Sequence, residues 1–384
     1  MIPQQHIAII AQEAGIAASQ VSSTARLLKE GATVPFIARY RKEATGSLDE
    51  MQIGLIRDRM QRLEELDKRR EAILISIGEQ EKLTPELQVA IEKAATLSEL
   101  EDLYLPYRPK RKTRATIAVA KGLEPLAKMI MAQRSFDLEG KALEFVDDEK
   151  QVYSADEALG GARDIIAEWI NENAAARGRI RQLFEREATI SSRVAKAREA
   201  DAGKYETYFD WSEKIKHAPS HRILAMFRGE NEGLLKLDIA PEKDKALNIL
   251  DRFFVKGDNP VSEQLVLAVE DSYKRLMGPS IETEIRRQLK EVADTEAIRV
   301  FAENLRQLLL APPLGQKRIL AIDPGFRTGC KLVCLDSEGR LLHNETIYPH
   351  PPQKQQRQAA AKIQNLVNAY QIEAIAIGNG FKTW

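Results

Sequence analysis

The hydrophobic period of the chain changes at the segment Ala311–Gly315, and this change limits the folds that the chain can adopt. Two prolines and a glycine make the segment typical of a linker. From Ile2 to Leu310, apolar residues recur mostly at the three-to-four-residue spacing of amphipathic helices. After the linker, short apolar runs of strand length alternate with turn residues. The sequence therefore predicts a mainly α fold, a multi-helical scaffold followed by a smaller α/β domain.

Three domains are expected along the chain. They are a helical N-terminal domain at 1–203, a helical central region at 204–314, and an incomplete α/β domain at 315–384. The central region should contain one short strand at Gly233–Ile239, where apolar and polar residues alternate. The stretch Ser154–Lys204 is predicted to form three helices.

The charge balance gives no global argument for a nucleic-acid or membrane partner. Lys plus Arg equals Asp plus Glu at 57 each, so any such partner must be recognised by a local cluster. The sequence has no apolar run of the roughly 18 residues that a membrane helix needs, and we expect a cytoplasmic protein. Its only cysteines, Cys330 and Cys334, lie about 13 Å apart along one predicted strand, too far for a disulfide. We expect both to be buried thiols.

The N-terminal residues predict two short helices on either side of Gly15. The pair resembles a helix-turn-helix element, and an ordinary helical hairpin is the alternative. A long helix should then begin at a capping box of Ser47 and Glu50 and end at Gly78. Its charges should pair along one solvated face at a spacing of four residues: Asp58 with Arg62, Glu64 with Lys68, and Glu65 with Arg69.

The most basic part of the chain lies between Leu103 and Leu123, which contains six basic residues and no acidic one. Prolines prevent a continuous helix there, so we expect an extended connector that offers cations to phosphates and tyrosine rings to bases. The candidate nucleic-acid-binding residues of this segment are Tyr104, Tyr107, Arg108, Lys110, Arg111, Lys112 and Arg114. In the alternative interpretation, the rings pack in a structural connector and the cations pair with acids such as Glu99, Glu101 and Asp102.

Two further basic clusters differ in what they predict. Arg39, Arg41 and Lys42 flank the aromatic Tyr40, and we add these three cations to the candidate interface. The second cluster is interrupted by acids and is expected on a solvated helix face; it comprises Arg177, Arg179, Arg181, Arg186, Arg193, Lys196 and Arg198.

One carboxylate, Asp323, ends an apolar strand and is followed at once by turn residues, where a metal ion or phosphate could approach. A two-metal nuclease needs several carboxylates, and the sequence between Glu345 and Glu373 has none. We therefore predict no metal site, and Asp323 would be a ligand only in a nuclease. His217 and His221 lack a nearby cysteine or acid, so a zinc site is not expected there.

Several long motifs resemble those of the bacterial Tex family of transcription accessory proteins: Thr33–Glu50, Leu100–Arg114, Pro219–Leu235 and Ala321–Gly329. The resemblance implies a helical scaffold and a YqgF-type domain with the RNase H-like fold associated with Holliday-junction resolvases. Helix-hairpin-helix and S1 domains that bind nucleic acid follow in the family. The tail Phe381–Trp384 departs from the family pattern, and we expect a truncation inside the RNase H-like domain.

The resemblance favours a nucleic-acid-binding transcription accessory scaffold without catalysis and without a cofactor. Its implied partners are RNA or DNA and RNA polymerase or other transcription machinery, with no membrane partner and no prediction of the oligomeric state. Two alternatives stay open, a resolvase-like metal-dependent nuclease and a scaffold that binds only proteins.

Overall fold

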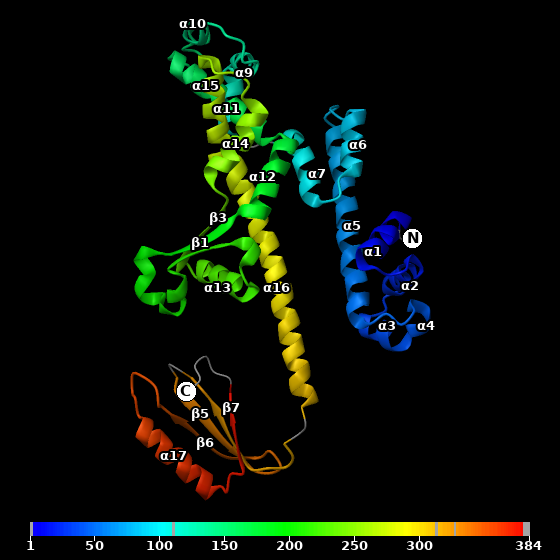
Figure 1. Ribbon diagram of the computed structural model, residues 1–384, viewed down its shortest axis with the longest axis vertical. Helices are drawn as coiled ribbons and strands as arrows, with labels where there is room; N and C mark the ends of the chain where they lie inside the picture. Colours follow the sequence, from blue (N-terminus) through cyan, green and yellow to red (C-terminus); the bar gives the residue numbers. More distant parts are fainter. Residues whose placement is uncertain (1–2, 110–111, 312–313, 326–327, 379–384) are drawn as a thin grey trace. The chain divides into compact units, whose positions relative to one another are not determined.

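The computed structural model describes residues 3–109, 112–311, 314–325 and 328–378, which divide into two compact units (Figure 1). One unit is Met1–Ala297 and the other is Ile298–Trp384. The largest cluster of buried residues runs from Ala115 to Ala293 and so includes residues on both sides of the predicted domain boundary at residue 203. The predicted fold class, a helical scaffold followed by a partial α/β domain, is confirmed, and the finer division into three domains stays a prediction.

Five helices at the N-terminus surround a small core that includes Ile10, Ile37 and Ile53. The predicted helical pair is confirmed, and Gly15 caps the first helix in the left-handed region at φ +64°. The helices are α1 (Gln4–Ala14), α2 (Ala18–Lys29), α3 (Val34–Tyr40), α4 (Lys42–Thr45) and α5 (Glu50–Gly78).

The N-cap of the long helix α5 lies two residues later than predicted. Asp49, not Ser47, is the N-cap, and its carboxylate accepts a hydrogen bond from the Gln52 N–H at 2.8 Å. Ser47 has a positive φ of 64° in the preceding turn, where the backbone is not in the extended conformation that an N-cap adopts. The predicted end at Gly78 is confirmed.

The predicted ion pairs along α5 are wrong: Asp58 pairs with its neighbour Arg57, and several other charges of α5 pair with other helices. Arg59 pairs with Glu13 of α1, Lys29 of α2 pairs with Glu64, and Arg69 pairs with Glu101. These interactions tie the N-terminal helices to α5.

The chain continues in helices up to residue 187. Thr84 caps α6, which begins at Pro85, and Thr96 and Glu99 form a capping box at the start of α7. The elements are α6 (Pro85–Lys93), α7 (Leu97–Tyr104), the 3-10 turn η1 (Leu105–Tyr107), α8 (Arg114–Ala120), α9 (Glu124–Met131), α10 (Leu138–Leu143), α11 (Ala155–Asn171) and α12 (Ala174–Glu187).

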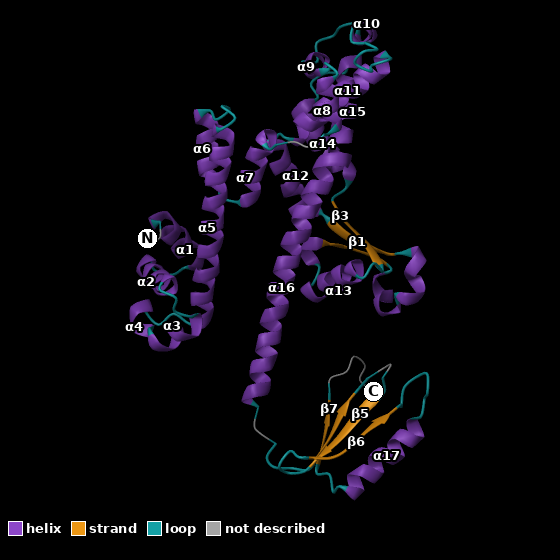
Figure 2. Cartoon of the chain, turned by 180° about the vertical axis from the view of Figure 1, so that it is seen from behind, coloured by secondary structure: helices purple, strands orange, loops and turns teal. Residues whose placement is uncertain are grey.

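A three-stranded antiparallel sheet, in the order β2-β1-β3, follows α12 (Figure 2). Three helices were predicted between Ser154 and Lys204, and the third is wrong because β1 occupies its place. Thr189, Ile190 and Val194 are β-branched residues that suit a half-buried strand, and β1 lies between two partners. The predicted strand at Gly233–Ile239 is confirmed as β3. The elements are β1 (Thr189–Val194), η2 (Lys196–Asp201), η3 (Gly203–Tyr208), β2 (Asp210–Lys214), η4 (Ile215–His217), α13 (Ser220–Asn231) and β3 (Leu235–Ala240).

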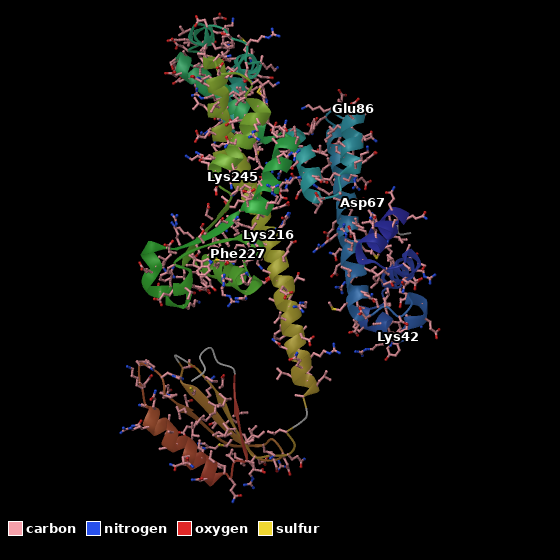
Figure 3. The ribbon with its side chains drawn as sticks, viewed as in Figure 1. Lys42, Asp67, Glu86, Lys216, Phe227 and Lys245 are labelled. Atoms are coloured by element: carbon pink, nitrogen blue, oxygen red, sulfur yellow. The ribbon has the colours of Figure 1, made fainter. Side chains whose placement is uncertain are left out.

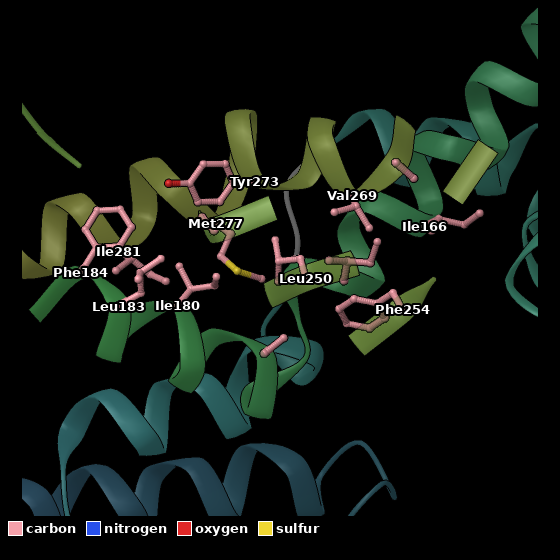
Figure 4. Packing of buried hydrophobic residues seen from close by; sticks show 14 of the residues in the cluster. Ile166, Ile180, Leu183, Phe184, Leu250, Phe254, Val269, Tyr273, Met277 and Ile281 are labelled. Atoms are coloured by element: carbon pink, nitrogen blue, oxygen red, sulfur yellow. The ribbon is translucent and has the colours of Figure 1, made fainter. Parts of the chain in front are cut away.

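Four further helical elements complete the larger unit: α14 (Lys243–Phe254), α15 (Pro260–Asp271), the π-helical turn η5 (Ser272–Met277) and α16 (Gly278–Leu310), which continues past Ala297. Figure 4 shows Ile180, Leu183 and Phe184 of α12 facing Met277 and Ile281 across the main core. At the sheet, the Ile239 N–H donates to Glu282 Oε1 at 3.0 Å, and Arg286 Nη2 donates to the Leu237 carbonyl at 2.6 Å. Side chains of α16 thus satisfy the outer edge of β3.

The second unit contains a four-stranded sheet in the order β6-β5-β4-β7, in which β4 and β7 are parallel. One helix, α17, covers buried residues of the sheet such as Leu320 and Cys334. Both cysteines are free and buried, as predicted, and burial raises the pKa of the Cys334 thiol. The elements are β4 (Ile319–Asp323), β5 (Cys330–Leu335), β6 (Leu341–Ile347), α17 (Gln356–Ala369) and β7 (Ala374–Ile377). Among the described residues, no helix is long and apolar enough to cross a membrane.

Candidate nucleic-acid interface

The basic connector lies between the end of α7 at Tyr104 and the start of α8 at Arg114. The chain turns once more through η1, which contains Pro106, and leaves the helix at Arg108. Thr113 then caps α8 by accepting from the Thr116 N–H at 3.1 Å. Two of the predicted binding residues, Lys110 and Arg111, lie outside the described residues.

Tyr104 is not available as a stacking platform, which corrects its predicted role. The residue is 8% exposed and packs with Leu100 and Ile73 in the core between α5 and α7. Its hydroxyl lies 2.9 Å from Ser76 Oγ, and the Arg69 guanidinium lies 5.3 Å from its ring centroid. Because Leu100 and Tyr104 are four residues apart on α7, they share the inner face of the helix.

Tyr107 is half-buried against the same core, and its carbonyl accepts from Gln80 Nε2 at 2.9 Å. In contrast, the side chains of Arg108, Lys112 and Arg114 are exposed. Arg114 lies beside Asp164 in a shallow pocket and counteracts the rise in the pKa of that carboxyl that burial causes. The connector therefore presents cations rather than rings to solvent.

In the alternative interpretation, Glu99, Glu101 and Asp102 would pair with these cations, but all three bind other groups. Glu99 accepts from the backbone N–H groups of Ala95 and Thr96 at the start of α7. Glu101 pairs with Arg69, and Asp102 pairs with two arginines of α12. Within the described residues, these three carboxylates therefore bind groups other than the connector cations Arg108, Lys112 and Arg114.

The pairing of Asp102 corrects a second expectation, because Arg177 and Arg181 are buried and do not lie on a solvated face. Arg177 Nε lies 2.5 Å from Asp102 Oδ1, and Arg181 Nη2 lies 2.8 Å from Oδ2. Arg181 also pairs with Glu284 of α16 at 2.8 Å. Although burial opposes its charged form, the hydrogen bond to Glu284 and the charge of Asp102 raise the pKa of the Arg181 guanidinium. This buried network joins α7, α12 and α16.

A cleft of about 560 Å³ lies beside the network and brings the connector close to α16. Arg108 of the connector and Arg287 of α16 both line the cleft and are exposed, whereas Arg69, Arg177 and Arg181 on its walls are paired with carboxylates. Glu65 also lines the cleft. Sequence reasoning missed Arg287, because it lies almost two hundred residues from the connector and only the packing of α16 brings the two together.

The other three predicted cations, Arg39, Arg41 and Lys42, are exposed around the end of α3 and the start of α4. Figure 3 labels Lys42 at this end of the N-terminal helices. Arg39 Nε lies 3.8 Å from Glu50 Oε1. The Arg41 guanidinium lies 5.4 Å from the ring centroid of Phe36, an exposed aromatic that sequence reasoning did not single out. This segment packs on the N-terminal core and the connector packs on the next one, so they form two separate candidate sites.

Asp323 is exposed at the end of β4, opposite Lys331 of β5. The described parts of the chain contain no group of three or more His, Cys, Asp or Glu residues placed to hold a metal ion. The backbone next to Asp323 on the parallel strand side is Gly378, which supplies no carboxylate. Within the described residues, the nuclease alternative is therefore supported by one carboxylate, Asp323.

Three protein-family models match the chain in order. Residues 4–78 match the Tex-like protein N-terminal domain, residues 133–301 match the Tex central region-like model, and residues 317–383 match the Tex protein YqgF-like domain.

Three similar proteins match nearly the whole chain. The uncharacterized protein YdcI of Bacillus subtilis is 46% identical over 97% of this chain and 52% of its own length. The transcriptional accessory protein Tex of Neisseria gonorrhoeae is 40% identical over 97% of this chain and 49% of its own length. The human S1 RNA-binding domain-containing protein 1 is 30% identical over 92% of this chain and 37% of its own length. This chain thus spans about half the length of its bacterial relatives, and it belongs to the Tex family, whose N-terminal, central and YqgF-like domains it contains.

Proposed function

We propose that the chain is a nucleic-acid-binding scaffold that assists transcription without catalysing a reaction. One relative is named a transcriptional accessory protein, and another is named for an S1 RNA-binding domain. The observation that carries the proposal is the exposure of the connector's cations. Its cations Arg108 and Lys112 are exposed, while the nearest acids in sequence, Glu101 and Asp102, are occupied by Arg69 and by the arginines of α12.

Exposed cations on the connector favour a polyanion as the ligand. Each contact between a cation and a phosphate releases a condensed counterion, which supplies sequence-independent binding of RNA or DNA. The connector site comprises Tyr107, Arg108, Lys110, Arg111, Lys112 and Arg114, with Arg287 across the cleft. RNA polymerase or another part of the transcription machinery is the proposed protein partner. A site of this kind needs no metal ion and no catalytic carboxylate.

The test is to replace the five cations of the connector, Arg108, Lys110, Arg111, Lys112 and Arg114, by alanine. The affinity for a fluorescent RNA oligonucleotide should fall by about tenfold or more, because the variant loses most of its phosphate contacts there. Fluorescence anisotropy at a fixed salt concentration measures the change.

A matched control removes the same amount of positive charge elsewhere in the larger unit. Arg57, Arg62, Lys68, Lys128 and Lys150 are also exposed, and their replacement by alanine should change the affinity much less. Equal losses for the two variants would show that only the total charge matters. An unchanged affinity of the connector variant would refute the site, and a chain that binds partner proteins but no oligonucleotide would be a protein-only scaffold.

A further inference from the structure

Helix α3 presents two aromatic rings to solvent. Phe36 is 41% exposed and Tyr40 is 68% exposed, while Ile37 and Ala38 of the same helix are buried. The ring centroids of Phe36 and Tyr40 lie 5.4 Å apart, with an angle of 46° between the ring planes. Their spacing of four residues places both rings on one side of the helix. Exposed rings that lie together are costly in water and typical of a binding surface.

Cations surround this aromatic pair. Arg41 lies over the Phe36 ring, and the Tyr40 ring lies beside Phe36 at a tilt, so that the guanidinium and the two rings form a continuous series of groups. Lys42 follows at the start of α4 (Figure 3), and no acidic residue occurs from Ala32 to Lys42. Glu50 lies nearby but is 3.8 Å from Arg39 and partly neutralises that residue. Arg41 and Lys42 are therefore the cations that can meet an anionic ligand.

Buried residues and hydrogen bonds fix the position of helix α3. Ile37 is fully buried in the N-terminal core, and Thr33 caps α3 by accepting from the Phe36 N–H at 3.4 Å. After α3, the buried Thr45 hydroxyl donates to the Arg41 carbonyl at 3.1 Å, and Gln20 Nε2 of α2 donates to the Thr45 carbonyl at 2.9 Å. A ligand would thus find the rings and cations already in place and would lose little of its affinity to their ordering.

We propose that Phe36 and Tyr40 form a base-stacking platform for single-stranded RNA or DNA, with Arg41 and Lys42 contacting the flanking phosphates. The inference rests on the proposed nucleic-acid binding and adds a second site that recognises bases and not only charge. Every base has a π-face, so aromatic platforms bind single strands of many sequences. Bases in a duplex are already stacked, and the platform should therefore discriminate against double strands. The local charge favours this ligand over a protein partner, whose contact surface would have to supply acids for Arg41 and Lys42.

The experiment compares Tyr40→Ala with the unchanged chain on two ligands of equal length and charge, an oligouridine and an abasic oligonucleotide. Tyr40→Ala should weaken oligouridine binding by about tenfold, the typical effect of losing one base–aromatic stack. It should leave binding of the abasic strand unchanged, because that strand has no base to stack. Tyr40→Phe keeps the ring and should bind oligouridine as the unchanged chain does.

Phe301→Ala is the matched control, since Phe301 is an aromatic residue as exposed as Tyr40, at 68%, but lies on α16 well beyond Arg287 in the sequence. It should not affect either ligand. Circular dichroism verifies that each variant is folded, and crosslinking of oligouridine to α3 by ultraviolet light gives a second readout.

Two results would overturn the platform. If Tyr40→Ala binds oligouridine as tightly as the unchanged chain, the rings do not stack on bases. If Tyr40→Ala weakens binding of the abasic strand by the same factor as binding of oligouridine, Tyr40 contributes to binding by a means other than base stacking. In both cases the unchanged chain still binds nucleic acid, and the proposed function stands. If the unchanged chain binds neither strand, the proposed function and the platform fail together.

Discussion

Replacing Asp102 by alanine is expected to lower the free energy of unfolding of the helical unit by about 3–5 kcal/mol, because it leaves a buried arginine without a carboxylate. Asp102 and Arg177 have side chains that are 5% and 6% exposed. Without Asp102, Arg181 keeps its ion pair with Glu284, but Arg177 keeps only the neutral oxygens of Asn171 and Ser280. Urea denaturation followed by circular dichroism measures the change.

An exposed aspartate of the same unit supplies the control for this prediction. Asp58 pairs with its neighbour Arg57 at 2.7 Å, and its side chain is 57% exposed. Asp58→Ala should change the free energy of unfolding by no more than about 0.5 kcal/mol. Equal stabilities of the two variants would mean that the network of Asp102 and the α12 arginines is not desolvated in solution.

The second large effect is expected at Phe184, which is 1% exposed in the main core (Figure 4). Phe184→Ala should cost about 3–5 kcal/mol, because it removes buried apolar area and leaves a cavity that helices α12 and α16 cannot close fully. The same denaturation measurement applies. Tyr153→Ala, which truncates a mostly exposed ring, should leave the denaturation midpoint nearly unchanged. A small loss at Phe184 would show that this part of the core repacks readily.

Local sequence signals predicted the elements that are determined by neighbouring residues. The helical pair on either side of Gly15 and the end of α5 at Gly78 appear where they were predicted. Strand β1 was missed because its partners β2 and β3 come later in the chain. The residues of β1 directly follow a helix, and they form a strand because they pair with β2 and β3. The pairing of distant residues is not visible in a local window.

The charged residues were harder to interpret than the apolar ones. Arg177 and Arg181 are four residues apart and share a face of α12 with Ile180 and Phe184, so their spacing could have indicated burial. Their partner Asp102 is distant in sequence, however, and a basic cluster alone does not show whether it faces solvent or a carboxylate. The same limit explains why Tyr104 was predicted to bind bases although it packs in a core.

The salt dependence of binding tests the central claim, that the connector contacts phosphates, most directly. The logarithm of the affinity should fall linearly with the logarithm of the salt concentration, by roughly 0.7 in slope for each phosphate contacted on a single strand. The five-alanine connector variant should show a shallower slope than the unchanged chain, while the control variant with five cations removed elsewhere should keep the original slope. Equal slopes for the unchanged chain and the connector variant would contradict the account, because the phosphates would then be bound by another surface.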